Sequence, residues 1–155
     1  MSRRAGIRFS DDEVAAFLDE QRTVTCATFG PRGWPHLAPL WYVVRAGRIW
    51  AWTFAKSQKA LDVARDPRAT LQVEAGEQYD QLRGVTLECD VVIHHELDTV
   101  AELGVEILRR YAGVTELPDV VVDGTRKQAA KRVGLEFVER RRASWDHRKL
   151  PAGVY

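Results

Sequence analysis

The sequence predicts a mainly β protein with peripheral helices (α+β), in which six to seven antiparallel strands form a closed or nearly closed barrel. Three observations predict this class. Short runs rich in β-branched and aromatic residues recur along the chain, tight glycine-containing turns separate the first of them, and helical periodicity is confined to a few segments. The 155 residues contain no repeat, low-complexity segment or linker. We therefore expect one domain over residues 1–155.

The N-terminal third is predicted to form one helix and three strands. Ser10 begins a capping box that is followed by apolar residues at helical spacing, which predicts a helix over Asp11–Glu20. Runs typical of strands cover Thr23–Phe29, His36–Val44 and Ile49–Phe54. Because short turns join these runs, we expect an antiparallel meander.

The middle of the chain is predicted to contain a short helix between strands. The helix covers Ser57–Arg65 and ends before an Asp-Pro pair. A strand over Ala69–Glu74, a polar loop over Gly76–Arg83 and a long alternating strand over Gly84–His94 follow. This order keeps consecutive strands close enough to pair as neighbours.

The C-terminal part is predicted to add helices and two more strands. A helix is expected over Leu97–Tyr111, followed by irregular chain over Val114–Val122 and a basic helical stretch from Asp123 to Lys131. Alternation then predicts strands at Val133–Arg140 and Ala143–Leu150.

Composition excludes several classes of protein. The net charge of +1 gives no bulk attraction to nucleic acid or to an anionic membrane. No apolar run reaches the roughly 20 residues of a membrane span, and the N-terminus lacks the apolar segment of a signal peptide. Cys26 and Cys89 lie in separate strand-like runs, so we expect buried free thiols and a cytoplasmic protein.

The strongest candidate for a ligand site lies where the strand ending at Phe54 meets the next helix. Ser57 and Lys59 open that helix, and Lys56 and Arg65 add charge nearby. Free N–H groups and the helix dipole favour a phosphate at such a helix start, although an ordinary capped helix explains this segment equally well. Aromatic residues in the Pro39–Tyr42 and Ile49–Phe54 segments could supply flat walls for a planar ring.

Other motifs are weaker. His94 and His95 lie on opposite faces of a strand, so we expect no metal site there. His36 follows a turn and is more typical of a structural donor than of a ligand contact. Arg140–Arg142 is best explained as a solvated connection. The Trp145–Leu150 segment mixes an aromatic ring, a carboxylate, an imidazole and cations, which suits an interface or ligand contact as well as a surface.

Together these motifs resemble the flavin- and deazaflavin-binding split β-barrels related to pyridoxamine 5′-phosphate oxidase. The resemblance covers about Asp12 to Leu150, and the order and spacing of its motifs carry it. The motifs are Gly33-Trp34-Pro35-His36 with Pro39-Leu40-Trp41, Thr53 with Ser57-Gln58-Lys59, Asp66-Pro67-Arg68, and Tyr79 with Leu82-Arg83-Gly84-Val85. The chain is most similar to the actinobacterial branch thought to use coenzyme F420.

The resemblance implies an FMN-binding split barrel that forms a homodimer, with two cofactors in clefts between subunits. Ser57 and Lys59 would meet the cofactor phosphate, with Gln58 and Lys56 beside them. Pro39, Leu40, Trp41 and Thr53 would line the ring, and Arg83 would approach from its loop. The oxidases themselves carry arginines where this chain has Ala38 and Gln58. Losing two guanidinium contacts disfavours vitamin B6 oxidase activity and tight FMN binding, and it is compatible with F420.

Three hypotheses of function follow. The first is an F420-dependent oxidoreductase that transfers a hydride to an unsaturated small molecule, the second is an FMN-dependent oxidoreductase, and the third is a non-catalytic dimer that binds F420, FMN or a tetrapyrrole. The sequence identifies no catalytic acid, and His36, Tyr42 and His147 are only candidate proton donors.

Overall fold

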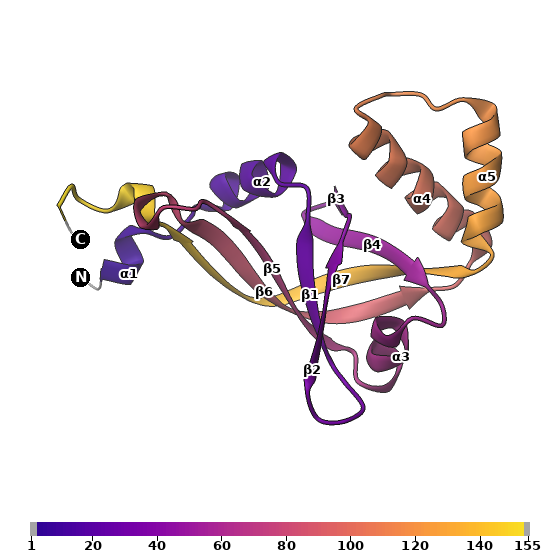
Figure 1. The fold of residues 1–155 in the computed structure, drawn as a ribbon, viewed down its shortest axis with the longest axis horizontal. Coiled ribbons are helices and arrows are strands. Elements are labelled where there is room, and N and C mark those ends of the chain that lie inside the picture. The colour runs from indigo at the N-terminus through magenta and orange to yellow at the C-terminus, as the bar shows by residue number, and fades with distance from the viewer. Residues whose placement is uncertain (1–2, 154–155) are drawn as a thin grey trace.

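The computed structural model describes residues 3–153 as a curled antiparallel sheet with helices at its ends and on one flank (Figure 1). The helices are α1 (Arg3–Gly6), α2 (Asp11–Glu20), α3 (Gln58–Arg65), α4 (Leu97–Ala112) and α5 (Asp119–Ala129). The strands are β1 (Val24–Phe29), β2 (Pro35–Leu40), β3 (Val43–Arg45), β4 (Arg48–Phe54), β5 (Arg68–Ala75), β6 (Arg83–His94) and β7 (Arg132–Asp146). Short 3₁₀ turns cover Tyr79–Gln81 and His147–Lys149.

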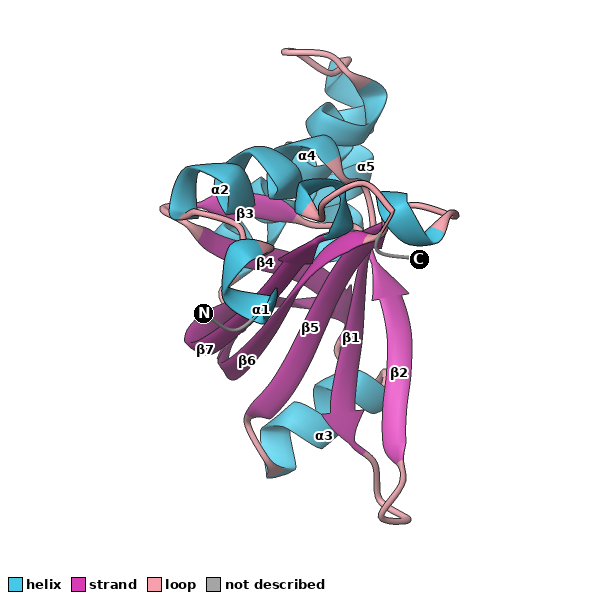
Figure 2. Ribbon diagram, turned by 90° about the vertical axis from the view of Figure 1, so that its left-hand side faces the viewer, coloured by secondary structure: helices cyan, strands magenta, loops and turns pink. Residues whose placement is uncertain are grey.

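The seven strands form one sheet in the order β2-β1-β5-β6-β7-β4-β3, and each neighbouring pair is antiparallel. The sheet curls into a half-barrel in which β2 and β3 are the two edge strands (Figure 2). The predicted class, mainly β with peripheral helices and a split-barrel type of sheet, is therefore confirmed.

The prediction of one strand over His36–Val44 is wrong, because the chain changes partners in the middle of it. β2 pairs with β1, whereas β3 pairs with β4. Trp41 and Tyr42 lie between the two strands, and the Tyr42 side chain is fully buried. Its hydroxyl donates to the Leu18 carbonyl at 2.6 Å, so the end of α2 holds this bend in place. The three N-terminal strands consequently do not form a simple meander.

The two predicted C-terminal strands are one. β7 runs without a break through the arginine run and ends in a 3₁₀ turn, with a register shift opposite Glu88 and Cys89. Two arginines of the run meet carboxylates on β6: Arg140 donates to Asp90 at 2.6 Å, and Arg141 lies 3.9 Å from Glu88. These cross-strand charge pairs let a polar segment continue as a strand.

The last helix begins earlier than predicted. α5 starts at Asp119, directly after Pro118, so the last four residues of the stretch expected to be irregular, 119–122, are helical. Proline restricts φ at the N-cap position, and α5 has no side-chain hydrogen bond at this cap. The helix α2 agrees with its prediction, since Ser10 and Glu13 form both hydrogen bonds of the capping box. The short α1 was not predicted.

Two apolar layers hold the fold together. Inward-facing residues of β1, β5, β6 and β7 pack against Phe17 and Leu18 of α2 and Val63 of α3. On the other side of β4, the α4 residues Leu103 and Ile107 pack against Val43 and two half-buried tryptophans, Trp50 and Trp52. Val63 therefore holds α3 against the inner of these two layers. None of the helices in the described part of the chain is long and apolar enough to span a bilayer.

Candidate anion site at the start of α3

The end of β4 and the start of α3 form the site predicted to hold an anion. The N–H of Ser57 donates to the carbonyl of Phe54 at 2.9 Å, which closes a tight turn between strand and helix. Ser57 is the N-cap of α3, and its Oγ accepts from the N–H of Ala60 at 3.3 Å. The other N–H groups of the first turn and the positive end of the helix dipole therefore lie beside this hydroxyl.

Three polar side chains meet at this point. Oγ1 of the buried Thr53 lies 3.1 Å from Oγ of Ser57, and Nζ of Lys59 donates to the same Thr53 oxygen at 3.2 Å. Within residues 3–153, neither Lys59 nor Lys56 forms an ion pair with a carboxylate. Two hydroxyls, an ammonium group and a helix start thus share one positive region, which fits the oxygens of a phosphate or carboxylate.

Gln58 faces a different partner. Its side-chain amide donates to Oδ1 of Asp62 at 2.7 Å. Asp62 is fully buried and also accepts from the Thr28 hydroxyl at 2.7 Å and from Arg65 at 3.2 Å. Burial acts to raise the pKa of this carboxyl, but the three hydrogen bonds outweigh burial and lower the pKa. Gln58 therefore helps to fix α3 on β1 and is not directed at the Ser57 hydroxyl.

The predicted ring wall lies at the far end of β2. Pro39 is exposed, Leu40 is buried, and the exposed ring of Trp41 stacks on Tyr111 with centroids 4.3 Å apart. Tyr111 also receives a hydrogen bond from the backbone N–H of Tyr42 at 2.9 Å. Within residues 3–153, no hydrogen bond, ion pair or ring contact joins Pro39, Leu40 or Trp41 to Ser57. The helices α2 and α3 lie at opposite ends of β1 (Figure 2).

Arg83 also lies far from the start of α3 within one chain. It opens β6 at the end of the sheet near α2, where it donates to Glu20 at 2.6 and 3.2 Å and stands over the ring of Phe17. The hydrogen bond from Arg83 lowers the pKa of the Glu20 carboxyl. The chain therefore brings together Thr53, Ser57 and Lys59, with Lys56 and Gln58 adjacent in sequence, but not Arg83.

The candidate proton donors differ in access. His36 is half-buried and lines a hollow of about 170 Å³ together with Gln58. Tyr42 is fully buried with its hydroxyl engaged, and burial raises its pKa to about 12, so it is not accessible to a ligand here. His147 contacts the carbonyl of Tyr79 at 2.7 Å. Of the three, His36 lies closest to the start of α3 in the fold.

Sequence reasoning missed the residues that hold Trp41 in place. Arg110 on α4 donates to the carbonyls of Leu18, Gln21 and Tyr42 at 2.7–3.0 Å, and so joins α4 to the end of α2. Tyr111 follows it and carries the Trp41 ring. These contacts join residues about 70 to 90 positions apart, so no local sequence pattern predicts them.

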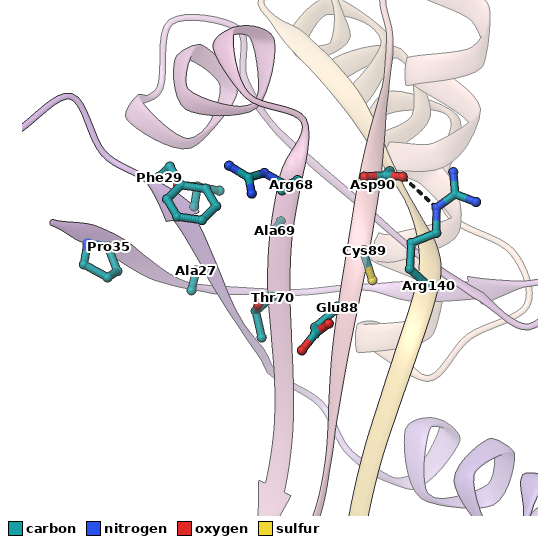
Figure 3. A pocket seen from close by; sticks show the side chains of 11 residues that line it. Ala27, Phe29, Pro35, Arg68, Ala69, Thr70, Glu88, Cys89, Asp90 and Arg140 are labelled. Carbon is teal, nitrogen blue, oxygen red and sulfur yellow. Dashed lines mark hydrogen bonds and ion pairs between the residues drawn. The ribbon is translucent and has the colours of Figure 1, made fainter. Parts of the chain in front are cut away.

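A larger hollow of about 400 Å³ is lined by residues of β1, β5 and β6 (Figure 3). Phe29 and Pro35 form one side of it. Its cations are paired, since Arg68 donates to Asp66 at 2.7 Å and Arg140 to Asp90 at 2.6 Å. This hollow therefore lacks the uncompensated charge that an anion would need.

The histidine pair at the end of β6 forms no metal centre in the described residues. His94 contacts Glu136 at 2.9 Å and stacks on Trp50 with centroids 4.7 Å apart, while His95 is exposed. The two side chains therefore have separate surroundings. Both cysteines are buried free thiols, as predicted.

Comparison with known proteins agrees with this architecture. The sequence profile described as pyridoxamine 5′-phosphate oxidase matches residues 10–143. The crystal structure of the conserved hypothetical protein Rv2991 from Mycobacterium tuberculosis is 44% identical, with a TM-score of 0.88 over 97% of this chain and 92% of that chain. The comparison with curated proteins gave no match.

Two more distant structures share the fold. One is named F420 reductase; it is 18% identical, with a TM-score of 0.65 over 83% of this chain and 94% of that one. The other is HutZ, the heme storage protein from Vibrio cholerae, at 13% identity and a TM-score of 0.65 over 84% and 89%. The profile match over most of the chain, together with the seven-stranded half-barrel, shows that the chain belongs to the pyridoxamine 5′-phosphate oxidase family.

Proposed function

We propose that the protein is an oxidoreductase that uses coenzyme F420 to transfer a hydride to an unsaturated small molecule. The group formed by Thr53, Ser57 and Lys59 at the start of α3 supports this proposal, because it offers two hydroxyls and an unpaired ammonium to a phosphate. When bound, F420 supplies the hydride from C5 of its deazaflavin. The protein would hold the ring, exclude water and orient the acceptor.

The small number of cations around the proposed phosphate position supports F420 over FMN as the cofactor. Gln58 is hydrogen-bonded to Asp62, and Ala38 has no polar side chain, so neither replaces the arginines of the oxidases. Among the described residues, Lys59 is left as the one cation that contacts the Thr53–Ser57 group. A ligand with charge spread along a tail gains from Lys56 and other surface cations, whereas a compact phosphate depends on the few groups around it.

We further propose that the working unit is a homodimer whose second subunit completes the cleft. Pro39, Leu40, Trp41 and Arg83 would then contact a cofactor whose phosphate is held by Ser57 and Lys59 of the other subunit. Strand β2 is a sheet edge, and the surface beside it is apolar: Trp34 is 74% exposed, Leu37 62% and Phe29 50%. Apolar surface of this kind is typical of an interface.

The dimer has a direct test. Leu37→Lys places a charge in the proposed interface without touching the core, and Val120→Lys on the exposed start of α5 is a matched control. We expect a dimer by analytical ultracentrifugation for the unaltered protein and the control, and a shift toward monomer for Leu37→Lys. A monomeric unaltered protein would remove the proposed role of the second subunit.

Two other functions have support of their own. An FMN-dependent oxidoreductase is consistent with the family, and it would be purified as a yellow protein with an absorbance band near about 450 nm. A non-catalytic binding protein is consistent with the similarity to a heme storage protein and with the engaged hydroxyl of Tyr42. It would bind F420, FMN or a tetrapyrrole and transfer no hydride with any electron donor.

The deciding experiment begins with the absorbance spectrum of freshly purified protein, followed by fluorescence titration with F420 and with FMN. F420 binding tighter than FMN binding is the expected result. No F420 binding below about 100 μM, which corresponds to about −5.5 kcal/mol, would refute the proposal. Reduced F420 is then mixed with unsaturated acceptors, and oxidation of the cofactor separates an enzyme from a binding protein.

A further inference from the structure

A second cation near the start of α3 has no oxygen partner. The guanidinium of Arg132, at the start of β7, lies over two aromatic rings of β4: its central carbon is 4.4 Å from the ring centroid of Trp52 and 4.0 Å from that of Phe54. Trp52 is itself pressed against Gly104 of α4. Rings that lie over a guanidinium leave the N–H groups at its edge free to donate.

Arg132 differs in this respect from the other arginines that are at least partly shielded from solvent. In the described residues, Arg45, Arg83 and Arg142 donate to carboxylates, and Arg110 donates to backbone carbonyls. Among the described residues Arg132 has no hydrogen-bond acceptor, and its Nε is buried without a partner. Burial lowers the pKa of this guanidinium, and no neighbouring carboxylate opposes the effect.

The surroundings of Arg132 add positive charge. The backbone N–H of Ala55 donates to the carbonyl of Lys131 at 2.9 Å, so the turn that precedes α3 lies beside the start of β7. Lys56 is the next residue of that turn, and both lysines are exposed. Within residues 3–153, neither lysine forms an ion pair with a carboxylate. Three cations without a carboxylate partner in the described residues therefore belong to the turn before α3 and to the adjoining start of β7.

We propose that Arg132, supported by Lys56 and Lys131, forms a second anion subsite that binds a carboxylate or phosphate group. Thr53 and Phe54 are consecutive on β4, so their side chains leave opposite faces of the sheet. The subsite is consequently separate from the Thr53–Ser57–Lys59 group and lies on the other side of the same turn. Its ligand is either the anionic tail of the proposed cofactor, an assignment that rests on the proposed function, or a separate anionic metabolite.

The Nε–H resonance of Arg132 gives a direct readout in ¹H–¹⁵N spectra of the full chain. The Arg132→Lys variant identifies the signal by its loss. We expect sodium phosphate, and separately a triglutamate peptide, to shift this signal saturably at constant ionic strength. The Nε–H signal of Arg140, which is already paired with Asp90, serves as the internal control and should not saturate. If neither probe shifts the Arg132 signal saturably, the subsite is refuted and the guanidinium only covers the rings.

Further arms separate this subsite from the first site and identify its ligand. In Lys59→Ala, phosphate should still shift the Arg132 signal. In Lys131→Ala, the affinity for phosphate should fall several-fold. Loss of the Arg132 shift in Lys59→Ala would mean that the two proposed sites are one site. Addition of F420 that moves the Arg132 signal assigns the cofactor tail as ligand. A shift with phosphate but not with F420 supports the subsite and assigns a separate anion.

Discussion

Removal of the Lys59 ammonium tests the proposed phosphate site most directly. Nζ of Lys59 has three N–H donors and uses one of them on Thr53, so two remain for a ligand. A hydrogen bond to a charged group contributes about 1.5–3 kcal/mol, and about 1.4 kcal/mol corresponds to a tenfold change in affinity. Lys59→Ala should therefore weaken F420 binding by at least about tenfold, and by about a hundredfold if both donors are used.

The fold should survive this change. Lys59 is only half-buried, and its one hydrogen bond is to a hydroxyl that also contacts Ser57. We expect a small change in melting temperature, and Lys59→Met, which keeps the aliphatic stem, should behave as Lys59→Ala does toward the cofactor. Lys127→Ala, at an exposed lysine on α5, removes the same charge away from the site.

Isothermal calorimetry or fluorescence titration with F420 measures the effect, and FMN is titrated in parallel. Unchanged F420 affinity in a folded Lys59→Ala protein would mean that the phosphate is held elsewhere. An equal loss of affinity in Lys127→Ala would mean that the effect comes from overall charge and not from a contact.

Three predictions concern the scaffold. Gly104→Ala adds a methyl group that overlaps the ring of Trp52. The free energy of unfolding, measured by chemical denaturation, should therefore fall by about 1–3 kcal/mol despite the better helix propensity of alanine. A more stable variant would contradict this packing. Cys26 and Cys89, whose pKa values burial raises to about 12, should not react with a thiol reagent at pH 8 until the protein unfolds, and rapid reaction of the native protein would show exposed thiols. Because the folded pKa of Asp62 is lowered, its ionised form stabilises the protein fully above the unfolded pKa of about 3.9 and loses this effect as the pH falls through the folded pKa. The stability difference between the unaltered protein and Asp62→Asn should thus shrink in acid, and a difference that grows there would reverse the sign of the argument.

Local patterns predicted the elements whose stabilising contacts are close in sequence. The capping box at Ser10 is confirmed because both of its hydrogen bonds span three residues. Ser57 is the N-cap of α3 for the same reason. Alternation identified the long strand β6, in which side chains of one face pack on the core. Each of these features depends on residues that are close in sequence, so residue types and spacing are sufficient to predict it.

Elements whose course depends on remote partners were predicted wrongly or not at all. The bend at Trp41 and Tyr42 is held by α2 and α4, and the arginine run of β7 continues as a strand because it pairs with β6, whose carboxylates lie opposite. Sequence spacing contains no record of contacts that close over tens of residues.

For the candidate site, the sequence by itself determined the hydroxyl and the ammonium at a helix start, Ser57 and Lys59, since a helix N-terminus and its cap are local features. The tertiary structure alone decided which groups accompany them. It placed Thr53 against both, left Arg83 at the far end of the sheet, and left Arg132 without an oxygen partner among residues 3–153. The physical reason is that strand pairing and helix packing, and not chain neighbours, fix where an unpaired charge comes to lie.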